Sequence, residues 1–179
     1  LSLDHNWATY KTNLMKSDTF IPYNPLGYSE QESAKESQSF LDEMLLRRSI
    51  REFIDKPVDK SIIHNIIKTA GSAPSGAHKQ PWTFCAISNP EMKKKIRVAA
   101  EKEEYVNYHG RMSEEWLDDL KKFGTDWNKP FLEVAPWLIV IFKKSYDLEG
   151  GDKKKNYYVN ESVGIAAGFL ISAIHKAGL

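Results

Sequence analysis

The chain has 179 residues, a formal net charge of +1, and a composition that is 41% hydrophobic and 27% charged. A chain of this length can bury one sizeable core, and its hydrophobic fraction excludes disorder over most of its length. The balanced charge gives no reason to expect nucleic acid or an anionic membrane as the main partner. Because there is one cysteine and the five histidines are scattered, we predict neither an internal disulfide nor a metal site.

The chain is predicted to begin with an extended arm, residues 1–32, that wraps a partner. This segment contains two prolines and a glycine and lacks the helical spacing of apolar residues. From Ser33 to about Leu46 apolar residues recur at helical spacing, which predicts a helix. We expect the main domain to occupy residues 33–179.

The rest of the domain is predicted to contain further helices and two strands. The helices are expected over 58–69, 90–103, 113–123 and 158–176, and the strands over 83–87 and 136–143. The second strand is apolar throughout, which predicts burial on both faces. Small residues in the last helix favour close packing in the centre of the domain or at a dimer interface. The run Lys93-Lys94-Lys95 is interpreted as solvated surface, and Cys85 as a packed thiol in a buried strand.

Only two strands are convincing in this sequence. Two strands do not form an independently stable sheet, and a strand as apolar as residues 138–142 needs neighbours on both sides. We therefore expect that C-terminal strands of the fold are missing from the 179 residues.

An arginine-rich run follows the first predicted helix. Its sequence is Arg47-Arg48-Ser49-Ile50-Arg51. Three guanidinium groups this close together can bind a phosphate through paired, charge-assisted hydrogen bonds. Cations at a helix C-terminus also serve simply to complement the helix dipole, and this alternative stays open.

A loop between the second helix and the first strand also suits a ligand. Its sequence is Ala73-Pro74-Ser75-Gly76-Ala77, and Gln80-Pro81-Trp82 follows. Pro74 and Gly76 allow a tight turn whose backbone amides can face a bound group. The alternative is an ordinary loop whose tryptophan packs against the core.

Together, the arginine run and this loop resemble the FMN-binding start of the nitroreductase superfamily. The resemblance implies an α+β fold with a central sheet flanked by helices, and a domain-swapped homodimer. It also implies FMN as cofactor, with a cation near flavin N1 stabilising the anionic reduced form. The FMN-binding residues it implies are Arg47, Arg48, Ser49, Ile50, Arg51, Pro74, Ser75 and Gly76.

Three residues within 104–130 suit the binding of an amino acid. Glu104 and Tyr108 are four residues apart, so on a helix they share one face, and Lys129 lies in a later segment without periodicity. A carboxylate can bind the ammonium group of a zwitterion, an amine can bind its carboxylate, and a phenol can cover it. The alternative is that all three are ordinary surface residues.

The spacing and surroundings of these three residues resemble the substrate lid of the iodotyrosine deiodinase family, over roughly residues 28–179. The resemblance implies FMN-dependent reductive dehalogenation of mono- and diiodotyrosine to tyrosine, with NADPH as the ultimate reductant through a separate reductase. It implies that the backbone amide of Ala77 meets the substrate phenolate. Glu104, Tyr108 and Lys129 would close the lid and exclude water.

Two other functions stay open. A general NAD(P)H-dependent nitro or quinone reductase on the same fold would have no use for a zwitterion clamp. A chain that truly ends at Leu179 would be an inactive isoform that pairs with full-length subunits. No apolar stretch reaches the roughly 20 residues of a membrane-spanning helix, so we expect a soluble domain, although animal relatives often carry an N-terminal anchor.

Overall fold

A serine and a glutamate fix the start of the first helix, α1 (Glu30–Leu46). Both the backbone N–H and the hydroxyl of Ser29 donate to the Glu32 carboxylate at 2.8 Å, and the Glu32 N–H donates back to Ser29 Oγ at 3.3 Å. This capping box satisfies N–H groups that have no partner inside the helix. The helix therefore begins three residues before the predicted Ser33, inside the predicted arm.

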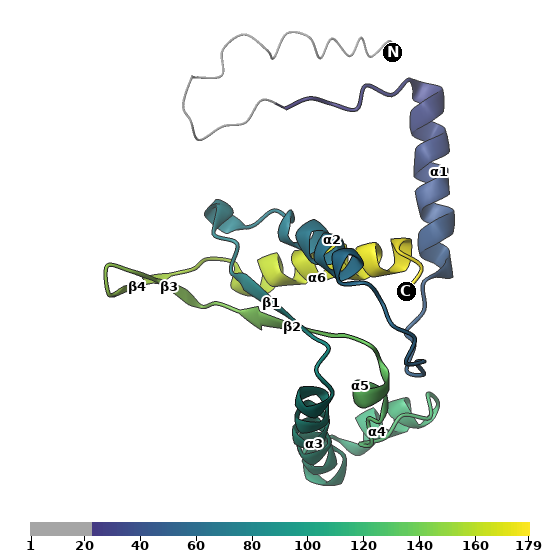
Figure 1. Ribbon diagram of the computed structural model, residues 1–179, viewed down its shortest axis with the longest axis vertical. Helices are drawn as coiled ribbons and strands as arrows, with labels where there is room; N and C mark the ends of the chain where they lie inside the picture. The colour runs from purple at the N-terminus through teal and green to yellow at the C-terminus, as the bar shows by residue number, and fades with distance from the viewer. Residues whose placement is uncertain (1–22) are drawn as a thin grey trace. The chain divides into compact units, whose positions relative to one another are not determined.

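Residues 23–179 are described in the computed structural model, which divides into two units, Leu1–Phe40 and Leu41–Leu179 (Figure 1). Most of the predicted arm lies outside the described residues. The remaining helices are α2 (Lys60–Gly71), α3 (Pro90–Val106), α4 (Glu114–Lys121), α5 (Phe131–Val134) and α6 (Val159–Lys176). A short 3-10 turn, η2 (Gly76–His78), and a π-helical turn, η3 (Asn107–Arg111), lie between them.

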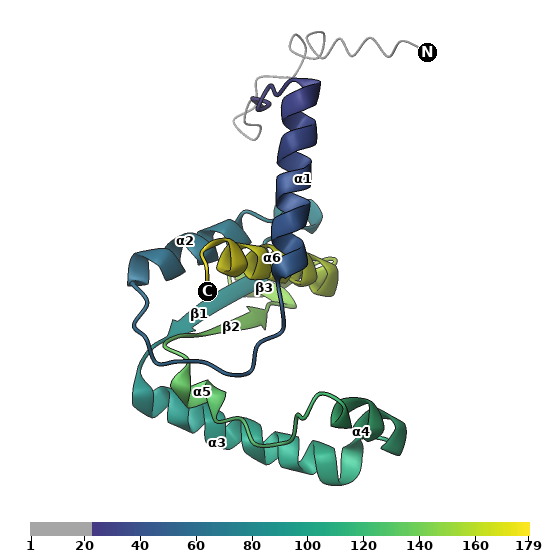
Figure 2. The same cartoon turned by 90° about the vertical axis from the view of Figure 1, so that its right-hand side faces the viewer.

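The first sheet is an antiparallel pair, β1 (Trp82–Ile87) and β2 (Leu138–Lys143), in which Trp82 lies opposite Lys143 and Ile87 opposite Leu138. Helices α2 and α6 lie along this pair (Figure 2). Ile66 and Ala70 of α2 pack against Leu170 of α6, and half-buried sheet residues contact this cluster. We call α2, β1, β2 and α6 the helix–sheet core.

The predicted burial of the second strand on both faces is wrong for the described residues. Its residues are half-buried as far as Ile141, and the last two, Phe142 and Lys143, are exposed. The helices cover the face that carries Ile139 and Ile141, and Phe142 points away from them with 55% of its surface exposed. Cys85 is half-buried for the same reason, since it lies on the less covered face of β1.

The second sheet is a hairpin that was not predicted. Strands β3 (Tyr146–Glu149) and β4 (Asp152–Lys155) pair antiparallel around Gly150 and Gly151, whose φ angles are 61° and 93°. Glycine adopts these left-handed angles without the steric cost of a Cβ atom. The four residues of β4 are polar and exposed, so the sequence lacks the apolar alternation by which strands are recognised.

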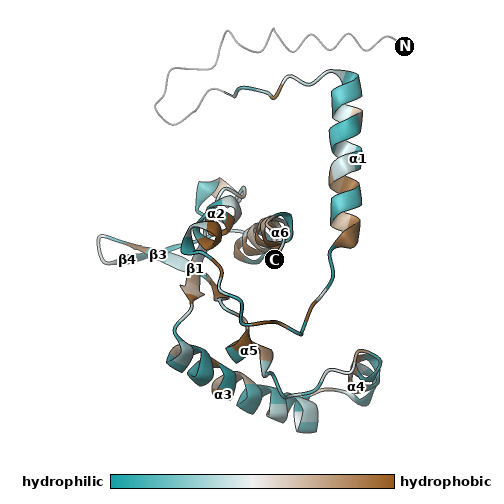
Figure 3. Ribbon diagram, turned by 45° about the vertical axis from the view of Figure 1, so that its right-hand side comes forward, coloured by the Kyte–Doolittle hydropathy of each residue, from teal (hydrophilic) through white to brown (hydrophobic). Residues whose placement is uncertain are grey.

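Helix α3 opens a separate layer that continues through η3, α4 and α5 as far as Ala135, which we call the α3 layer. Asn89 caps the helix by accepting from the Met92 N–H at 2.9 Å. This layer is largely hydrophilic (Figure 3). The predicted solvation of Lys93 is wrong. The residue is 7% exposed, and its ammonium donates to the carbonyls of Glu133 at 2.8 Å and Ala135 at 2.9 Å.

Candidate functional site

The three residues suited to an amino acid come together at the end of α3. Lys129 Nζ lies 3.4 Å from Glu104 Oε2 and 5.5 Å from the centroid of the Tyr108 ring. Glu104 lies in the last turn of α3, Tyr108 in η3, and Lys129 in the loop before α5. The side chains of Lys129 and Glu104 are 14% and 31% exposed, so solvent reaches the pair without surrounding it. We call these three residues the clamp.

Tyr108 does not occupy a regular α-helical position. It lies in the π-helical turn η3, which the Met112 N–H closes by donating to the Asn107 carbonyl at 2.9 Å. A π turn holds an extra residue and so redirects the side chains that follow α3. Glu104 and Tyr108 therefore do not share the face of a regular α-helix that the sequence suggested. Lys129 still reaches both side chains. Single π turns are frequent at functional sites.

Aromatic rings attach the loop of Lys129 to the same helix end. Tyr105 stacks on His109 with ring centroids 4.0 Å apart, and it meets Trp127 edge-on at 5.5 Å. Trp127 lies two residues before Lys129 in the chain, and its residue is 37% exposed. These contacts hold the loop near η3 through surfaces that remain partly open to water.

The electrostatics of the clamp suit an exchange of partners. Glu104 accepts from the amide of Asn107 at 3.3 Å, and the Lys129 ammonium donates to the Asp126 carbonyl. The Glu104–Lys129 pair is partly exposed, and ion pairs of this kind contribute little net free energy. A zwitterion that offered its ammonium to Glu104 and its carboxylate to Lys129 would replace one ion pair by two.

Two guanidinium groups of the arginine run have no partner within residues 23–179. Arg48 donates to the carbonyls of Leu45 at 2.6 Å and Arg47 at 2.8 Å, so it completes the end of α1 as the helix-dipole alternative anticipated. No ion pair or side-chain hydrogen bond with a described residue involves Arg47 or Arg51. All residues of the run, including Ser49 and Ile50, are exposed.

The loop of Ala77 has a strained backbone. Ala77 has φ 49°, and the other described non-glycine residues with positive φ lie in or beside this loop: His78, Gln80 and Tyr158. Such angles cost on the order of 1–3 kcal/mol per residue and cluster at ligand sites. Among the described residues no acceptor is found for the Ala77 N–H, and the residue is exposed. This amide is therefore available to a bound group.

The start of α6 shapes that loop. The Gly76 N–H donates to Ser162 Oγ at 3.3 Å, and Ser162 is 2% exposed. A Cβ atom at Gly76 would lie 2.8 Å from Tyr158 Cδ2, closer than such atoms approach. Pro74 is exposed, while Ser75 is half-buried and its hydroxyl accepts from the Gln80 N–H at 2.9 Å. Gly76 is thus favoured by packing against Tyr157 and Tyr158.

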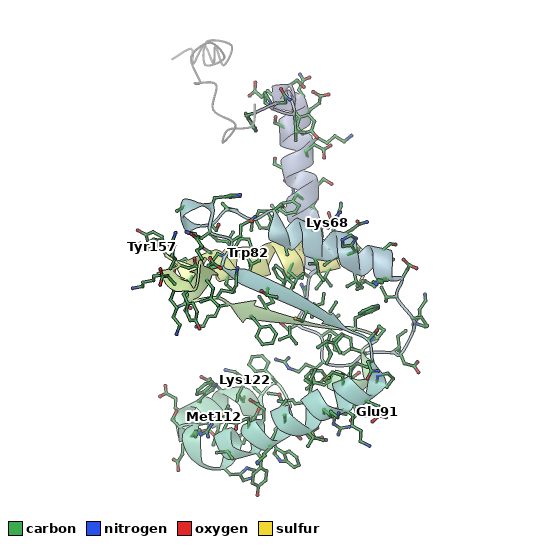
Figure 4. The ribbon with its side chains drawn as sticks, turned by 60° about the vertical axis from the view of Figure 1, so that its left-hand side comes forward. Lys68, Trp82, Glu91, Met112, Lys122 and Tyr157 are labelled. Atoms are coloured by element: carbon green, nitrogen blue, oxygen red, sulfur yellow. The ribbon has the colours of Figure 1, made fainter. Side chains whose placement is uncertain are left out.

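The candidate groups lie in three places along one chain. The loop of Ala77 contacts Ser162 in the first turn of α6, whereas Glu43, shortly before the arginine run, binds His175 and Lys176 at the helix end. At 1.5 Å per residue these two ends are roughly 20 Å apart. The clamp lies in the α3 layer; Figure 4 shows Trp82 and Tyr157 around the sheet, and Glu91, Met112 and Lys122 in that separate layer.

Two residues beside the clamp were missed in the sequence. Arg97 Nε lies 2.7 Å from Glu101 Oε1, and the same oxygen accepts the Lys129 N–H at 2.8 Å. Their four-residue spacing and opposite charges were a signal, although it is shared with ordinary solvated helix pairs. Within the described part of the chain, no group of three or more metal-binding side chains was found. Nor is any described helix long and apolar enough to cross a membrane.

Comparison with known proteins identifies the fold family. The Nitroreductase family profile matches residues 45–179. A crystal structure of oxidized iodotyrosine deiodinase bound to FMN and 3-iodo-L-tyrosine superposes with a TM-score of 0.69 and 28% identity, covering 78% of this chain and 70% of that one. The predicted nitroreductase-like fold is therefore confirmed.

Relatives in sequence narrow the family. The chain is 55% identical to iodotyrosine deiodinase from Haliscomenobacter hydrossis, over 93% of this chain and 75% of that protein. It is 48% identical to iodotyrosine deiodinase from Hydra vulgaris, over 93% of this chain and 62% of the relative. The chain thus spans three quarters of one relative and less than two thirds of the other. It belongs to the nitroreductase family and, within that family, to the iodotyrosine deiodinases.

Proposed function

We propose that this chain carries out FMN-dependent reductive dehalogenation of mono- and diiodotyrosine. The aryl carbon–iodine bond breaks, and two electrons and one proton convert the ring to that of tyrosine while iodide leaves. The observation that carries the proposal is the clamp, where Lys129 Nζ lies 3.4 Å from Glu104 Oε2 and above the Tyr108 ring. The similar structure bound to FMN and 3-iodo-L-tyrosine supports it.

The residues present fit FMN. Arg47 and Arg51 offer guanidinium groups without a carboxylate partner among residues 23–179, which suits a phosphate. Arg48, Ser49 and Ile50 complete that run. Pro74, Ser75 and Gly76 form the tight turn proposed to contact the flavin. When bound, reduced FMN supplies the two electrons of the reaction.

The chain's own groups bind and orient the amino acid. The Glu104 carboxylate accepts hydrogen bonds from the substrate ammonium, and the Lys129 ammonium donates to the substrate carboxylate. Tyr108 covers the bound zwitterion. The Ala77 N–H, free of any described acceptor, donates to the phenolate oxygen and stabilises its negative charge. Residues 104–130 act as a lid, and their closure excludes water from the reacting ring.

A homodimer is part of the proposal. Ile165 and Phe169, four residues apart on one face of α6, are 44% and 39% exposed, an apolar surface that a second subunit would bury. The Ala77 loop contacts the start of α6, Glu43 before the arginine run binds the end of that helix, and the clamp lies in the α3 layer, a spread that favours a site shared by two copies. The family resemblance supports NADPH as the ultimate reductant, delivered through a separate reductase.

A general nitro or quinone reductase is the second candidate. Similar structures include an FMN-dependent nitroreductase from Clostridium difficile, at 21% identity and a TM-score of 0.55, so the scaffold alone does not select a substrate. A nitroarene or quinone carries no zwitterion, and Glu104 and Lys129 would then have no ligand to bind.

The test measures binding and iodide release by the FMN-loaded full-length protein, with dithionite as the reductant. Lys129→Ala and Glu104→Ala are each expected to raise the Kd for iodotyrosine at least tenfold, or about 1.4 kcal/mol. Asp119→Ala is the matched control, because it removes an exposed ion pair with Lys122 in the same lid.

The outcomes separate the two candidates. Unchanged iodotyrosine binding in both clamp variants would reject the zwitterion assignment. Reduction of nitroarenes without iodide release would favour the general reductase. A native protein without visible flavin absorbance would contradict the proposed FMN dependence.

A further inference from the structure

One face of α3 carries polar side chains that bind the chain segment containing Lys129. Lys93, Arg97 and Glu101 are spaced by four residues, so they line one face of the helix. All three contact residues 128–135, which follow 28 or more positions later in the chain. The clamp residue Glu104 lies one further turn along the same helix.

Glu101 holds the backbone of Lys129 directly. Its Oε1 atom accepts the Lys129 N–H at 2.8 Å and lies 2.7 Å from Arg97 Nε. The Glu101 side chain is 16% exposed, so water competes weakly for this oxygen. A displacement of Glu101 would move the Cα atom of Lys129, and with it the ammonium that faces Glu104.

Arg97 fixes the orientation of Glu101 and binds the segment at two other points. Its Nη2 atom donates to Asn128 Oδ1 at 3.2 Å, and its Nη1 atom lies 3.4 Å from Glu133 Oε1. One planar guanidinium group therefore connects α3 to residues on both sides of Lys129. The hydrogen bond from Arg97 holds the pKa of Glu101 below its ordinary value, although burial opposes it, so the carboxylate stays ionised at neutral pH.

Lys93 fixes the far end of the segment. Its buried ammonium donates to two backbone carbonyls at the end of α5, those of Glu133 and Ala135. Burial of an ammonium group is unfavourable unless it is hydrogen-bonded, so these bonds are strongly favoured once the residue is enclosed. They limit how far residues 130–135 can move from α3.

Apolar side chains of this segment are only partly buried, and two of its rings make contacts: Trp127 meets Tyr105 edge-on, and Phe131 lies 6.1 Å from Phe53 between ring centroids. Trp127 and Val134 are 37% and 38% exposed, and Ala135 is the buried hydrophobic residue of 126–135. The contact with the backbone of Lys129 itself is polar, through the Glu101 carboxylate. We propose that Arg97 and Glu101 are positioning residues that hold Lys129 against Glu104 for binding of the substrate carboxylate. This inference rests on the proposed function for the role of Lys129.

Two measurements test the inference on the FMN-loaded full-length protein. The first is amide hydrogen exchange of residues 126–135 without substrate, which does not depend on the proposed activity. Glu101→Ala is expected to speed this exchange about tenfold or more, because the loop opens more often. Glu103→Ala is the matched control, since it removes an exposed carboxylate that lies 3.0 Å from Arg111 on the same helical stretch.

The second measurement compares the Kd of iodotyrosine with that of an iodophenol that lacks the amino-acid group. Glu101→Ala is expected to raise the Kd of iodotyrosine about tenfold and that of the iodophenol less than about twofold. Glu101→Gln keeps an oxygen that can accept the Lys129 N–H, so it should restore part of the loss. Arg97→Lys should weaken the binding of iodotyrosine but not that of the iodophenol, because an ammonium cannot bind three separated oxygens in one plane.

Two outcomes would overturn the inference. Unchanged exchange of residues 126–135 in Glu101→Ala would show that the carboxylate does not hold the loop. An equal rise in both dissociation constants would show a general structural role. A wild-type protein that binds both ligands alike would instead refute the proposed function, and the exchange data would still decide whether Glu101 positions the loop.

Discussion

The helix–sheet core and the α3 layer are held together by different forces. In the core, Ile66, Ala70 and Leu170 are 3%, 0% and 5% exposed, and their contacts are apolar. In the α3 layer, Lys93, Arg97 and Glu101 join the helix to residues 128–135 by hydrogen bonds and an ion pair, beside partly exposed aromatic contacts. Close-packed apolar side chains make the core a rigid scaffold. Polar contacts can be exchanged for those of a ligand, which suits a segment that closes over a substrate.

The comparison predicts that truncation in the core has the largest effect on global stability. Leu170→Ala should lower the free energy of unfolding by about 2–5 kcal/mol, because it leaves a cavity among buried aliphatic side chains. Urea or thermal unfolding would measure this. Val98→Ala in α3 is the control, since Val98 is 60% exposed and little surface is lost. Equal effects of the two substitutions would contradict the distinction between the regions.

A smaller loss is expected where the core meets the candidate site. Gly76→Ala would place a Cβ atom 2.8 Å from Tyr158 Cδ2 and 3.2 Å from the Tyr157 carbonyl. Overpacking of this kind costs about 1–3 kcal/mol. We expect loss of stability together with weaker FMN and iodotyrosine binding, because the strained loop that carries the Ala77 amide must shift.

Gly71→Ala is the matched control for that experiment. Gly71 ends α2 and has an ordinary φ, and a Cβ atom at this position would meet nothing within 4 Å. Unfolding curves and flavin titrations of the two variants would be compared. If Gly76→Ala bound FMN and iodotyrosine as tightly as Gly71→Ala, the loop would not be part of the site.

The two regions also differ in how well the sequence predicts them. The stripe of Ile62, Ile63, Ile66 and Ile67 predicts α2, and the apolar run of β2 predicts a strand. The burial of Lys93 was not predicted, since its partners are carbonyls some 40 residues later. Nothing local distinguishes it from the solvated Lys94.

The candidate site follows the same division. The types of Glu104, Tyr108 and Lys129 suggested a zwitterion clamp, and their convergence required the π turn and the return of the chain from α4. Arg97 and Glu101 have a recognisable spacing, but a solvated pair has the same one. The contact of Gly76 with Ser162, 86 residues apart, depends on the packing of α6 against the sheet. The sequence therefore predicts the residues that would bind a ligand better than it predicts the contacts that hold those residues in place.

The smallest predicted effect is a local response of the α3 layer to acid. The Arg97 hydrogen bond lowers the pKa of Glu101, burial opposes this, and the Lys129 N–H adds to the lowering. The ionised Glu101 carboxylate therefore stabilises the fold fully above the unfolded pKa of about 4.3, and this stabilisation is lost as the pH falls through the lower folded pKa. Protonation removes the anion that binds Arg97 and Lys129, so residues 126–135 should exchange amide hydrogens faster in acid.

Local hydrogen exchange is the suitable measurement, because Asp59 and Asp147 also have lowered pKa values and contribute to any global acid transition. The exchange of residues 126–135, corrected for the intrinsic pH dependence, would be compared with that of the buried turn around Leu170. Glu101→Gln should remove the extra acid response of residues 126–135, since an amide does not titrate. A response that persisted in Glu101→Gln would show that another group causes the acid sensitivity, and would remove Glu101 from its control.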